Sequence, residues 1–315
     1  MKCFDDFLYI VRPEVYLKTI KKGPLKYVPD KWFRNVKPRI VTTFTNDQNI
    51  VIGKGVGVFT DYENMKSEQY LRGIASVKKM VSESEKFIVL DLIQLLTLEE
   101  LDYIQGETKL KVVDGKDVRL FFTPYVLKRI CNALEKELID KELLIISDNS
   151  LKANQLIVNM SKDMRFLTAF GVKLEEQVEL SKTVYDSTGL SIFFTNNVDK
   201  ILGSYHIIIN LRENVSISLK NLRSRAIVFD LSISKNLSKE ILKYNANAII
   251  VEDFLFTYKN YLRENYFFDT KGEIPSHKYG ALQQFNLDDF SKIVINNVSY
   301  TIEELEIGRA SCRER

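Results

Sequence analysis

Apolar and polar residues alternate in blocks along the second half of the chain, and the blocks predict strands and helices in turn. Six short segments are nearly continuous in Ile, Val, Leu and Phe, as expected for parallel strands covered on both faces. These predicted strands are Leu143–Ser147, Phe166–Phe170, Leu190–Thr195, His206–Leu211, Ala226–Leu231 and Ala248–Phe254. Helices are predicted between the first of them, at Leu151–Lys162, Glu175–Ser187 and Val198–Leu202. This alternation predicts a doubly wound parallel sheet.

The first half of the chain predicts a smaller α/β domain. Residues 1–40 hold four of the six prolines and the only tryptophan, Trp32, so we expect short pieces draped over the body. The elements predicted after them are strands at Arg39–Phe44 and Val51–Thr60 joined by a turn at Asn46–Asn49, a helix between Lys66 and Glu85, a strand at Phe87–Leu92, a short hairpin near Asp114-Gly115 and a helix over Pro124–Leu138.

Three glycines in Gly53-Lys54-Gly55-Val56-Gly57 allow two interpretations. Glycine-rich loops bind phosphate when a helix begins directly after them. No helix is predicted directly after Gly57, so we favour a glycine-bearing strand over a phosphate loop.

Composition indicates a globular protein, with 45% hydrophobic and 28% charged residues. The last nine residues, 307–315, match the translation of a sequencing-adapter oligonucleotide, so we expect them to lie outside the natural fold. The alternative is a genuine basic tail. They carry three arginines and one glutamate, so without them the net charge of +3 falls to +1. That net charge does not indicate a nucleic-acid or anionic-membrane partner.

Cysteine usage and hydropathy favour a bacterial cytoplasmic protein. Outside the tail the cysteines are Cys3 and Cys131, too few and too far apart for a disulfide framework or a metal cluster. Cys131 is predicted to pack inside a helix rather than to act as a nucleophile. The longest apolar run, Phe87–Leu98, is interrupted by Asp91 and Gln94 and is too short to span a bilayer. The excess of Lys, Asn and Ile is typical of an AT-rich bacterial genome.

The first turn of the predicted doubly wound sheet lacks glycine. A dinucleotide-binding unit carries G-x-G-x-x-G there, whereas this chain has Ser147-Asp148-Asn149-Ser150-Leu151-Lys152-Ala153. We expect Asn149 and Ser150 to cap the following helix, and Asp148 to point into the space that a phosphate needs. Free N–H groups at Asn149 and Ser150 can still bind an anion weakly.

Two further residues complete the candidate cofactor contacts. The second strand is followed by Phe170-Gly171-Val172-Lys173, which has no acid for the ribose of NAD, whereas Lys173 can meet a 2′-phosphate. The predicted contacts are Asn149, Ser150, Lys173 and Asn210, and the predicted cofactor is none or weakly bound NADP.

The order of segments resembles the long-chain acyl-(acyl carrier protein) reductases, a branch of the shikimate-dehydrogenase and glutamyl-tRNA-reductase type of Rossmann protein. The resemblance covers most of residues 7–285 and is collinear rather than motif-specific. It includes Tyr9–Pro13, Leu25–Pro29, Val56–Val58, Arg165–Thr168, Thr195–Leu202 before His206–Asn210, and Ala226–Asp230.

The resemblance implies a glycine-rich turn that binds NADPH and a cysteine that carries the acyl group. The glycine turn would fall on Ser147–Ala153, where glycine is absent. The family's cysteine would fall in Tyr279-Gly280-Ala281, which has no thiol. A covalent step needs a nucleophile, so the acyl-enzyme mechanism does not carry over.

Only two histidines are available for acid–base chemistry. His206 begins a buried strand, and we expect it to be structural. His277 is predicted in a loop near the family's cysteine position, which makes it the better catalytic candidate of the two, but we favour a surface histidine over a catalytic one. No His, Cys or Glu spacing indicates a metal site.

The sequence therefore predicts an N-terminal α/β domain at 1–140 and a degenerate Rossmann-like domain at 141–290. The first function hypothesis is a diverged, non-catalytic relative of the acyl reductases that retains recognition of a small acyl or nucleotide ligand or of a partner. The alternative is an active NAD(P)H-dependent oxidoreductase that acts on an acyl or aldehyde-type substrate by a non-covalent mechanism. The oligomeric state is left open.

Overall fold

The computed structural model describes residues 6–33, 36–46, 48–59, 68–244, 247–257 and 272–305. The chain forms two compact units, each built from two segments. The first comprises Met1–Gly115 and Phe256–Asp289, and the second Lys116–Leu255 and Phe290–Arg315. This division differs from the predicted boundary near residue 140. Helix α4 (Lys116–Ala133) packs on α5 (Ser150–Met160) of the second unit, and a late segment returns to the first.

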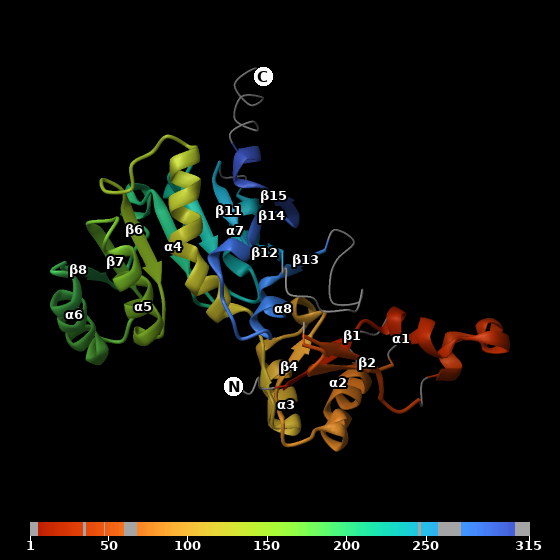
Figure 1. Cartoon of the computed structure of the whole chain (residues 1–315). Helices are drawn as coiled ribbons and strands as arrows, with labels where there is room; N and C mark the ends of the chain where they lie inside the picture. The colour runs from red at the N-terminus through yellow and green to blue at the C-terminus, as the bar shows by residue number, and fades with distance from the viewer. Residues whose placement is uncertain are drawn as a thin grey trace. The chain divides into compact units, whose positions relative to one another are not determined.

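The first unit contains a five-stranded sheet in the order β2-β3-β1-β4-β5 (Figure 1). Its strands are β1 (Asp6–Val11), β2 (Arg39–Thr45), β3 (Val51–Gly57), β4 (Glu85–Leu90) and β5 (Lys111–Val112). β2 pairs with β3 antiparallel, and the other pairs are parallel. The α-helices described in this unit are α1 (Pro13–Ile20), α2 (Glu68–Ala75), α3 (Leu98–Thr108) and α8 (Ser276–Gly280).

Several expectations for this unit are wrong. Residues 1–40 are not only draped pieces, because β1 is the central strand of the sheet and Phe7–Val11 are all buried. The helix predicted between Lys66 and Glu85 is shorter: α2 gives way to a 3₁₀ turn at Ser76–Met80, while 60–67 lie outside the described residues. No hairpin forms near Asp114-Gly115, since Gly115 has φ 77° and turns the chain into α4.

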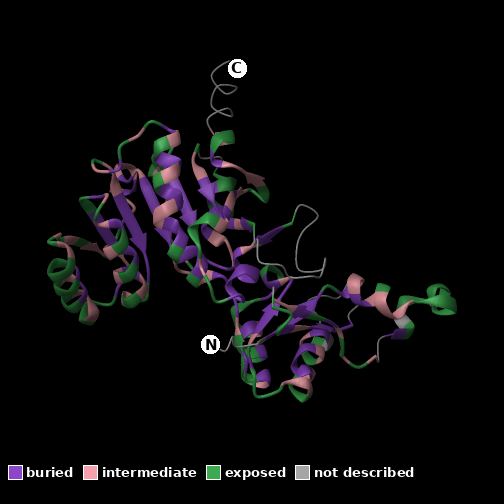
Figure 2. Cartoon of the chain, viewed as in Figure 1, coloured by how far each residue is buried: buried purple, intermediate pink, exposed green. Residues whose placement is uncertain are grey.

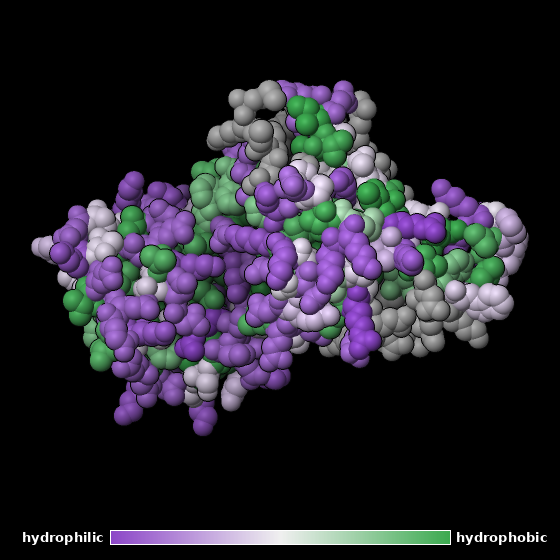
Figure 3. Space-filling model, turned by 90° about the horizontal axis from the view of Figure 1, so that it is seen from below, coloured by the Kyte–Doolittle hydropathy of each residue, from purple (hydrophilic) through white to green (hydrophobic). Residues whose placement is uncertain are grey.

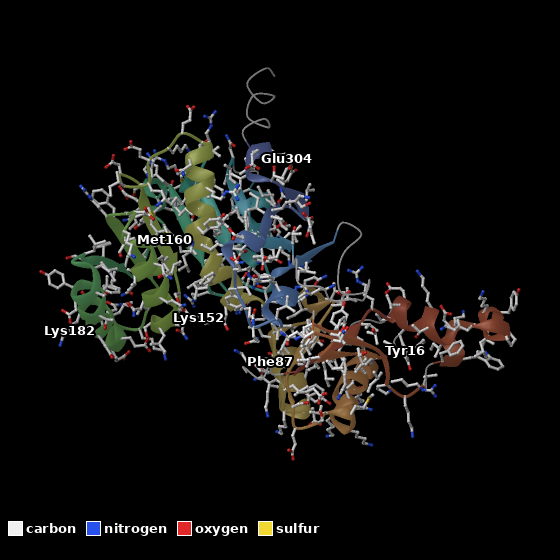
Figure 4. The ribbon with its side chains drawn as sticks, viewed as in Figure 1. Tyr16, Phe87, Lys152, Met160, Lys182 and Glu304 are labelled. Atoms are coloured by element: carbon white, nitrogen blue, oxygen red, sulfur yellow. The ribbon has the colours of Figure 1, made fainter. Side chains whose placement is uncertain are left out.

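The glycines of β3 confirm the strand interpretation, because side chains from the neighbouring strands β1 and β2 and from helix α1 fill the space beside them. A Cβ on Gly53 would lie 2.6 Å from the Phe7 ring, and one on Gly55 2.3 Å from Thr42. A Cβ on Gly57 would lie 2.0 Å from the ring of Tyr16, which is labelled in Figure 4. These glycines therefore serve close packing of side chains across the sheet.

The second unit contains a six-stranded sheet in the order β11-β10-β9-β6-β7-β8, and every pair in it is parallel. Its strands are β6 (Glu142–Ile146), β7 (Phe166–Phe170), β8 (Ile192–Thr195), β9 (Ile207–Asn210), β10 (Ile227–Asp230) and β11 (Ile249–Val251). Numbered within the sheet, this is the 3-2-1-4-5-6 order of a Rossmann fold. The predicted fold class is confirmed.

Helices α5, α6 (Leu174–Thr188) and α7 (Asn236–Lys243) connect these strands. On one face, alternate strand residues such as Leu144, Ile208 and Val228 form a core with the side chains of Leu237 and Ile241 from α7. Figure 2 shows the central strands β6, β9 and β10 of this sheet almost entirely buried, whereas no residue of the edge strand β8 is buried.

The predicted helix at Val198–Leu202 is wrong. The segment forms turns and a 3₁₀ helix at Leu202–Ser204. The Asn197 N–H donates to Thr195 Oγ1 at 3.2 Å, and the Asp199 N–H donates to Asn197 Oδ1 at 2.9 Å. These local side-chain bonds compete with helical ones.

Two other boundaries differ from the prediction. The helix predicted from Pro124 begins at Lys116 and contains Pro124 in its interior. The strand predicted at Ala248–Phe254 is two strands, β11 and β12 (Asp253–Thr257), because the Glu252 N–H between them turns to the carbonyl of Val294. β12 belongs to a third sheet, in the order β13-β12-β14-β15, with β13 at Glu273–Pro275, β14 at Phe290–Ile295 and β15 at Val298–Tyr300.

Candidate functional site

The turn from β6 into α5 is held by its own side chains. The Ser147 hydroxyl donates to the carbonyl of Asn149 at 2.9 Å and accepts from the Asn149 N–H at 3.1 Å. The Asn149 Oδ1 accepts from the N–H of Lys152 at 2.9 Å (Lys152 is labelled in Figure 4). Asn149 is therefore the helix cap, as predicted. The prediction that Ser150 also caps is wrong, because Ser150 is the first residue of the helix itself.

Asp148 lies beside an arginine at the centre of the sheet. Its largely exposed carboxylate is 3.7 Å from Nε of Arg212, which follows β9. β6 and β9 are neighbours in the sheet, and the order of strands reverses between them, which is where α/β proteins bind ligands. At this point the structure brings together the Asp148 carboxylate and the Arg212 guanidinium. The N–H groups of Asn149 and Lys152 at the same turn are already bonded to side chains.

Asn210 supports the backbone of Arg212. The Asn210 amide is buried and donates to Asp230 Oδ1 and to the Arg212 carbonyl, both at 2.9 Å. Its oxygen accepts from the Arg212 N–H at 3.0 Å. The assignment of Asn210 as a cofactor contact stays a prediction, and the bonds in the structure fix the backbone of Arg212.

Arg212, which follows β9, lies against the turn after β7. Gly171 has φ 91°, and a Cβ there would lie 3.0 Å from both Nη1 of Arg212 and the carbonyl oxygen of Ser147. Lys173 is exposed at the start of α6 and makes no side-chain cap. Of the two cations, Arg212 is the one packed against the turn, and it was not identified from the sequence. A basic residue two positions after a central buried strand is the signal that could have found it.

His277 is neither in a loop nor at the surface. It lies in the short helix α8 and is buried, so both parts of that expectation are wrong. The ring of the adjacent Tyr279 stacks on Phe256 with centroids 4.1 Å apart, and its hydroxyl donates to Asp289 at 2.8 Å. Tyr279 is fully buried, so α8 is anchored firmly in the first unit and the position of Lys278 is fixed with it.

A buried cluster of charges in the first unit was not predicted. Asp91 follows β4 and receives three donors: the Tyr9 hydroxyl at 2.6 Å, the Arg12 Nε and the Lys278 ammonium. The ammonium also lies 5.3 Å from the centroid of the Tyr9 ring. We call these four residues the Asp91 cluster. β1 and β4 are adjacent parallel strands, so Arg12 and Asp91 mark their carboxyl ends, the usual ligand side of an open α/β sheet.

The electrostatics of the Asp91 cluster favour its charged form. Burial alone raises the pKa of Asp91, but Lys278, Tyr9 and Arg12 together hold that pKa below its usual range. Burial and the Asp91 charge raise the pKa of the Tyr9 hydroxyl, so this hydroxyl stays a donor. A buried ammonium fixed against a carboxylate is a proton donor with a defined position.

Two groups are open to a ligand: Arg12, which is part of the Asp91 cluster, and Glu14, two residues further along the chain. The Nε of Arg12 donates to Asp91, and the two terminal nitrogens of its guanidinium have no hydrogen bond to any residue that the structure describes. Glu14, on the first turn of α1, has a buried Oε2 that also lacks a hydrogen-bond partner among the described residues. Unsatisfied buried polar atoms are uncommon in native proteins and point to an additional group.

Other candidate chemistry is limited. Within the described ranges, no group of His, Cys, Asp and Glu is arranged to hold a metal ion. Cys131 is buried, as expected for a packed helical cysteine, and burial raises the pKa of its thiol to about 11. His206 is half-buried just before β9, where its Nδ1 accepts from the Glu142 N–H at 3.4 Å. No helix in the part of the chain that the structure describes is long and apolar enough to cross a membrane.

Comparison with known proteins shows no family. No protein-family model matches the chain, and no curated protein matches it. Among solved structures, the L-tryptophan dehydrogenase of Nostoc punctiforme is 14% identical, with a TM-score of 0.35, over 78% of this chain and 70% of that one. The Listeria monocytogenes shikimate 5-dehydrogenase, solved with shikimate and NAD, is 10% identical, with a TM-score of 0.34, over 78% and 85%. The dipicolinate synthase A chain of Bacillus subtilis is 13% identical, with a TM-score of 0.36, over 57% and 59%. Similarities this low carry no argument, so the fold is assigned from the order and direction of the strands alone.

Proposed function

We propose that the protein is a diverged, Rossmann-like ligand-binding protein that lacks covalent acyl-reductase activity and binds a small polar ligand at the Asp91 cluster. The observation that carries the proposal is the closed β6–α5 turn. A pyrophosphate needs free N–H groups there, whereas the Ser147 and Asn149 side chains already accept from two of them. The residues present therefore do not fit the usual contact with a dinucleotide.

The absence of a suitable thiol among the residues that the structure describes supports the same conclusion. Ala281 stands where the resemblance places the acyl-carrying cysteine, and it is buried. Cys131 is the cysteine in the described residues, and the raised pKa of its thiol keeps it protonated near neutral pH. A thiol in that state is a poor nucleophile.

The Asp91 cluster supports ligand recognition. The half-exposed Arg12 guanidinium presents two nitrogens in the fork geometry that suits a carboxylate or phosphate. The unpartnered oxygen of Glu14 can accept from a hydroxyl or amino group of the same ligand. This combination suits a small polar molecule of mixed character.

Calorimetry with NADPH and NADH tests the proposal. At millimolar concentration we expect either no saturable binding or a weak NADPH signal that Arg212→Ala removes. A micromolar dissociation constant, or NADPH oxidation with acyl or aldehyde substrates at ordinary enzyme rates, would overturn it. The ligand site is tested separately, by thermal shift against carboxylate and phosphate compounds with wild type and Arg12→Gln.

A second candidate function is favoured by one specific observation. The Lys278 ammonium is buried, fixed by Asp91 and next to the Tyr9 hydroxyl. Such a group can protonate the oxygen of an aldehyde or acyl carbonyl while it is being reduced. The cluster thus supports an NAD(P)H-dependent oxidoreductase that uses a non-covalent mechanism.

Lys278→Met separates the two functions. For a reductase, this variant loses turnover while Lys278→Arg retains part of it, and the pH–rate profile changes shape. If the protein only binds its ligand, wild type shows no turnover to lose, and ligand affinity is the property that changes.

A further inference from the structure

Residues 18–33 form a projecting arm on the first unit, made of the end of α1 and two 3₁₀ turns at Gly23–Tyr27 and Asp30–Phe33 (Figure 1). The side chains of Tyr27 and Trp32 are 90% and 75% exposed, and Leu25 is also exposed. No residue of the first 3₁₀ turn is buried, and Figure 2 shows the tip of the arm as exposed. Large apolar side chains gathered at one exposed place mark an interaction site.

The arm is ordered by its own contacts rather than by packing of its tip. Lys21 pairs with Asp30 at 2.6 Å and lies 5.9 Å from the centroid of the buried Phe33 ring. The Val28 N–H donates to the Leu25 carbonyl at 3.2 Å, and the Trp32 N–H donates to the Pro29 carbonyl at 3.0 Å. The arm is therefore closed at its base, and its apolar side chains face the solvent.

The arm also concentrates positive charge. Residues 18–33 contain five lysines and one aspartate, a net charge of +4, against +3 for the whole chain, so the remainder of the chain is net negative. Lys18, Lys22 and Lys26 are exposed and form no ion pair with any residue that the structure describes. Figure 3 shows strongly hydrophilic side chains beside pale and apolar ones at the right of the view, where the arm lies.

We propose that the arm docks on an anionic lipid bilayer, with Trp32, Tyr27 and Leu25 entering the headgroup region and the lysines contacting lipid phosphates. Tryptophan and tyrosine favour the membrane interface, where an apolar ring and a polar edge are both accommodated. Juxtaposed lysines are attracted to the negative surface potential. The exposed aromatic residues belong to a projecting segment, a shape that suits insertion into a deformable layer. The near-neutral net charge of the whole chain conceals this local arrangement.

Trp32 is the only tryptophan of the chain, so intrinsic fluorescence reports directly on the arm. The full-length protein is titrated with phosphatidylcholine vesicles, with and without phosphatidylglycerol. We expect a blue shift and quenching by brominated lipid only when phosphatidylglycerol is present. Lys22→Glu/Lys26→Glu should weaken binding about tenfold or more. In co-sedimentation, Tyr27→Ser/Trp32→Ser should reduce binding comparably.

Leu174→Ser/Val178→Ser on α6 is the matched control, because these side chains are as exposed as those of the arm. It should bind vesicles like wild type. Equal binding to neutral vesicles, or sedimentation without a change in Trp32 fluorescence, would overturn the proposal. A blue shift that depends on protein concentration without lipid would instead identify a second copy of the chain as the occupant. A blue shift with an acidic protein and none with vesicles would identify a protein partner.

Discussion

Single residues carry most of the chemistry of this chain, and Asp91 shows why they were hard to identify. In the sequence it only interrupts an apolar run. In the structure it is the common acceptor for Tyr9, Arg12 and Lys278, which come from a strand, the residue after it and a distant helix. Spacing along the chain cannot reveal an acceptor whose donors are so far apart.

Lys278→Met should lower the free energy of unfolding by about 2 to 4 kcal/mol, because it removes one partner from a buried pair and leaves Asp91 less compensated. Urea denaturation measures the change. The control is Lys243→Met, which loses an exposed pair with Glu240 and should cost less than about 0.5 kcal/mol. Equal losses in the two variants would show that burial of the Asp91 cluster contributes nothing.

The depressed pKa of Asp91 sets the sign of a pH effect. In the folded protein this carboxylate holds its charge to lower pH than it does in the unfolded chain. Its contribution to stability is therefore fully present above the unfolded value of about 3.9 and is lost as pH falls through the folded pKa. The difference in unfolding free energy between wild type and Asp91→Asn should stay constant from pH 7 to about pH 5 and shrink as the pH falls further. A difference independent of pH would contradict the assignment.

At the scale of elements, hydrophobic pattern predicted the second sheet well, because strands covered on both faces are apolar throughout. The pattern failed where local hydrogen bonds of polar groups determine the backbone conformation. A bond from the Asp199 N–H to the Asn197 side chain favours turns where a helix was predicted. The Glu252 N–H bonds to Val294, so one predicted strand is two strands. For the turn after β6, the helix cap Asn149 was predicted correctly, since capping depends on residues adjacent in sequence. Arg212 and the Asp91 cluster depend on strand order, which the pattern does not encode.

Gly57→Ala and Gly55→Ala should each destabilise the first unit by about 1 to 3 kcal/mol, because the new methyl overlaps Tyr16 or Thr42. Gly106→Ala is the matched control. Gly106 lies in helix α3, where an added methyl would meet nothing within 4 Å, so this substitution should stabilise by up to about 1 kcal/mol. Thermal unfolding distinguishes the three variants. Loss of stability in all of them would indicate a general effect of the methyl group.

Asp148→Gly/Ser150→Gly should destabilise the second unit by about 1 kcal/mol without creating tight dinucleotide binding. Ser150 is a helical residue, and the Asn149 side chain would still occupy the Lys152 N–H. Calorimetry with NADPH and urea denaturation of the same preparation give both results. Micromolar affinity in this variant would mean that the rest of the pocket is intact.

For the molecule as a whole, the division into two units predicts additive effects. Lys278 and Asn149 belong to different units, and the Asp91 pair of the one and the Lys152 bond of the other involve different partners. The loss of unfolding free energy in Lys278→Met/Asn149→Ala should equal the sum of the single losses to within about 0.5 kcal/mol. Both single variants and the double variant are measured in urea at one pH. A coupling well beyond that limit would show that the two sites interact energetically despite lying in different units.

The interrupted first unit has a consequence for synthesis. Its sheet is complete once residue 112 has been made, but α8 and its Lys278 emerge only after almost the entire second unit has left the ribosome. Until then Asp91 lacks one of its three donors. Domains generally fold as they are made, with the N-terminal domain first. Here that order is partly reversed, because the six-stranded sheet of the second unit can form before the first unit is complete. A chain truncated before residue 278 would contain every strand of the six-stranded sheet but not α8, and we expect its first unit to be the more sensitive to protease.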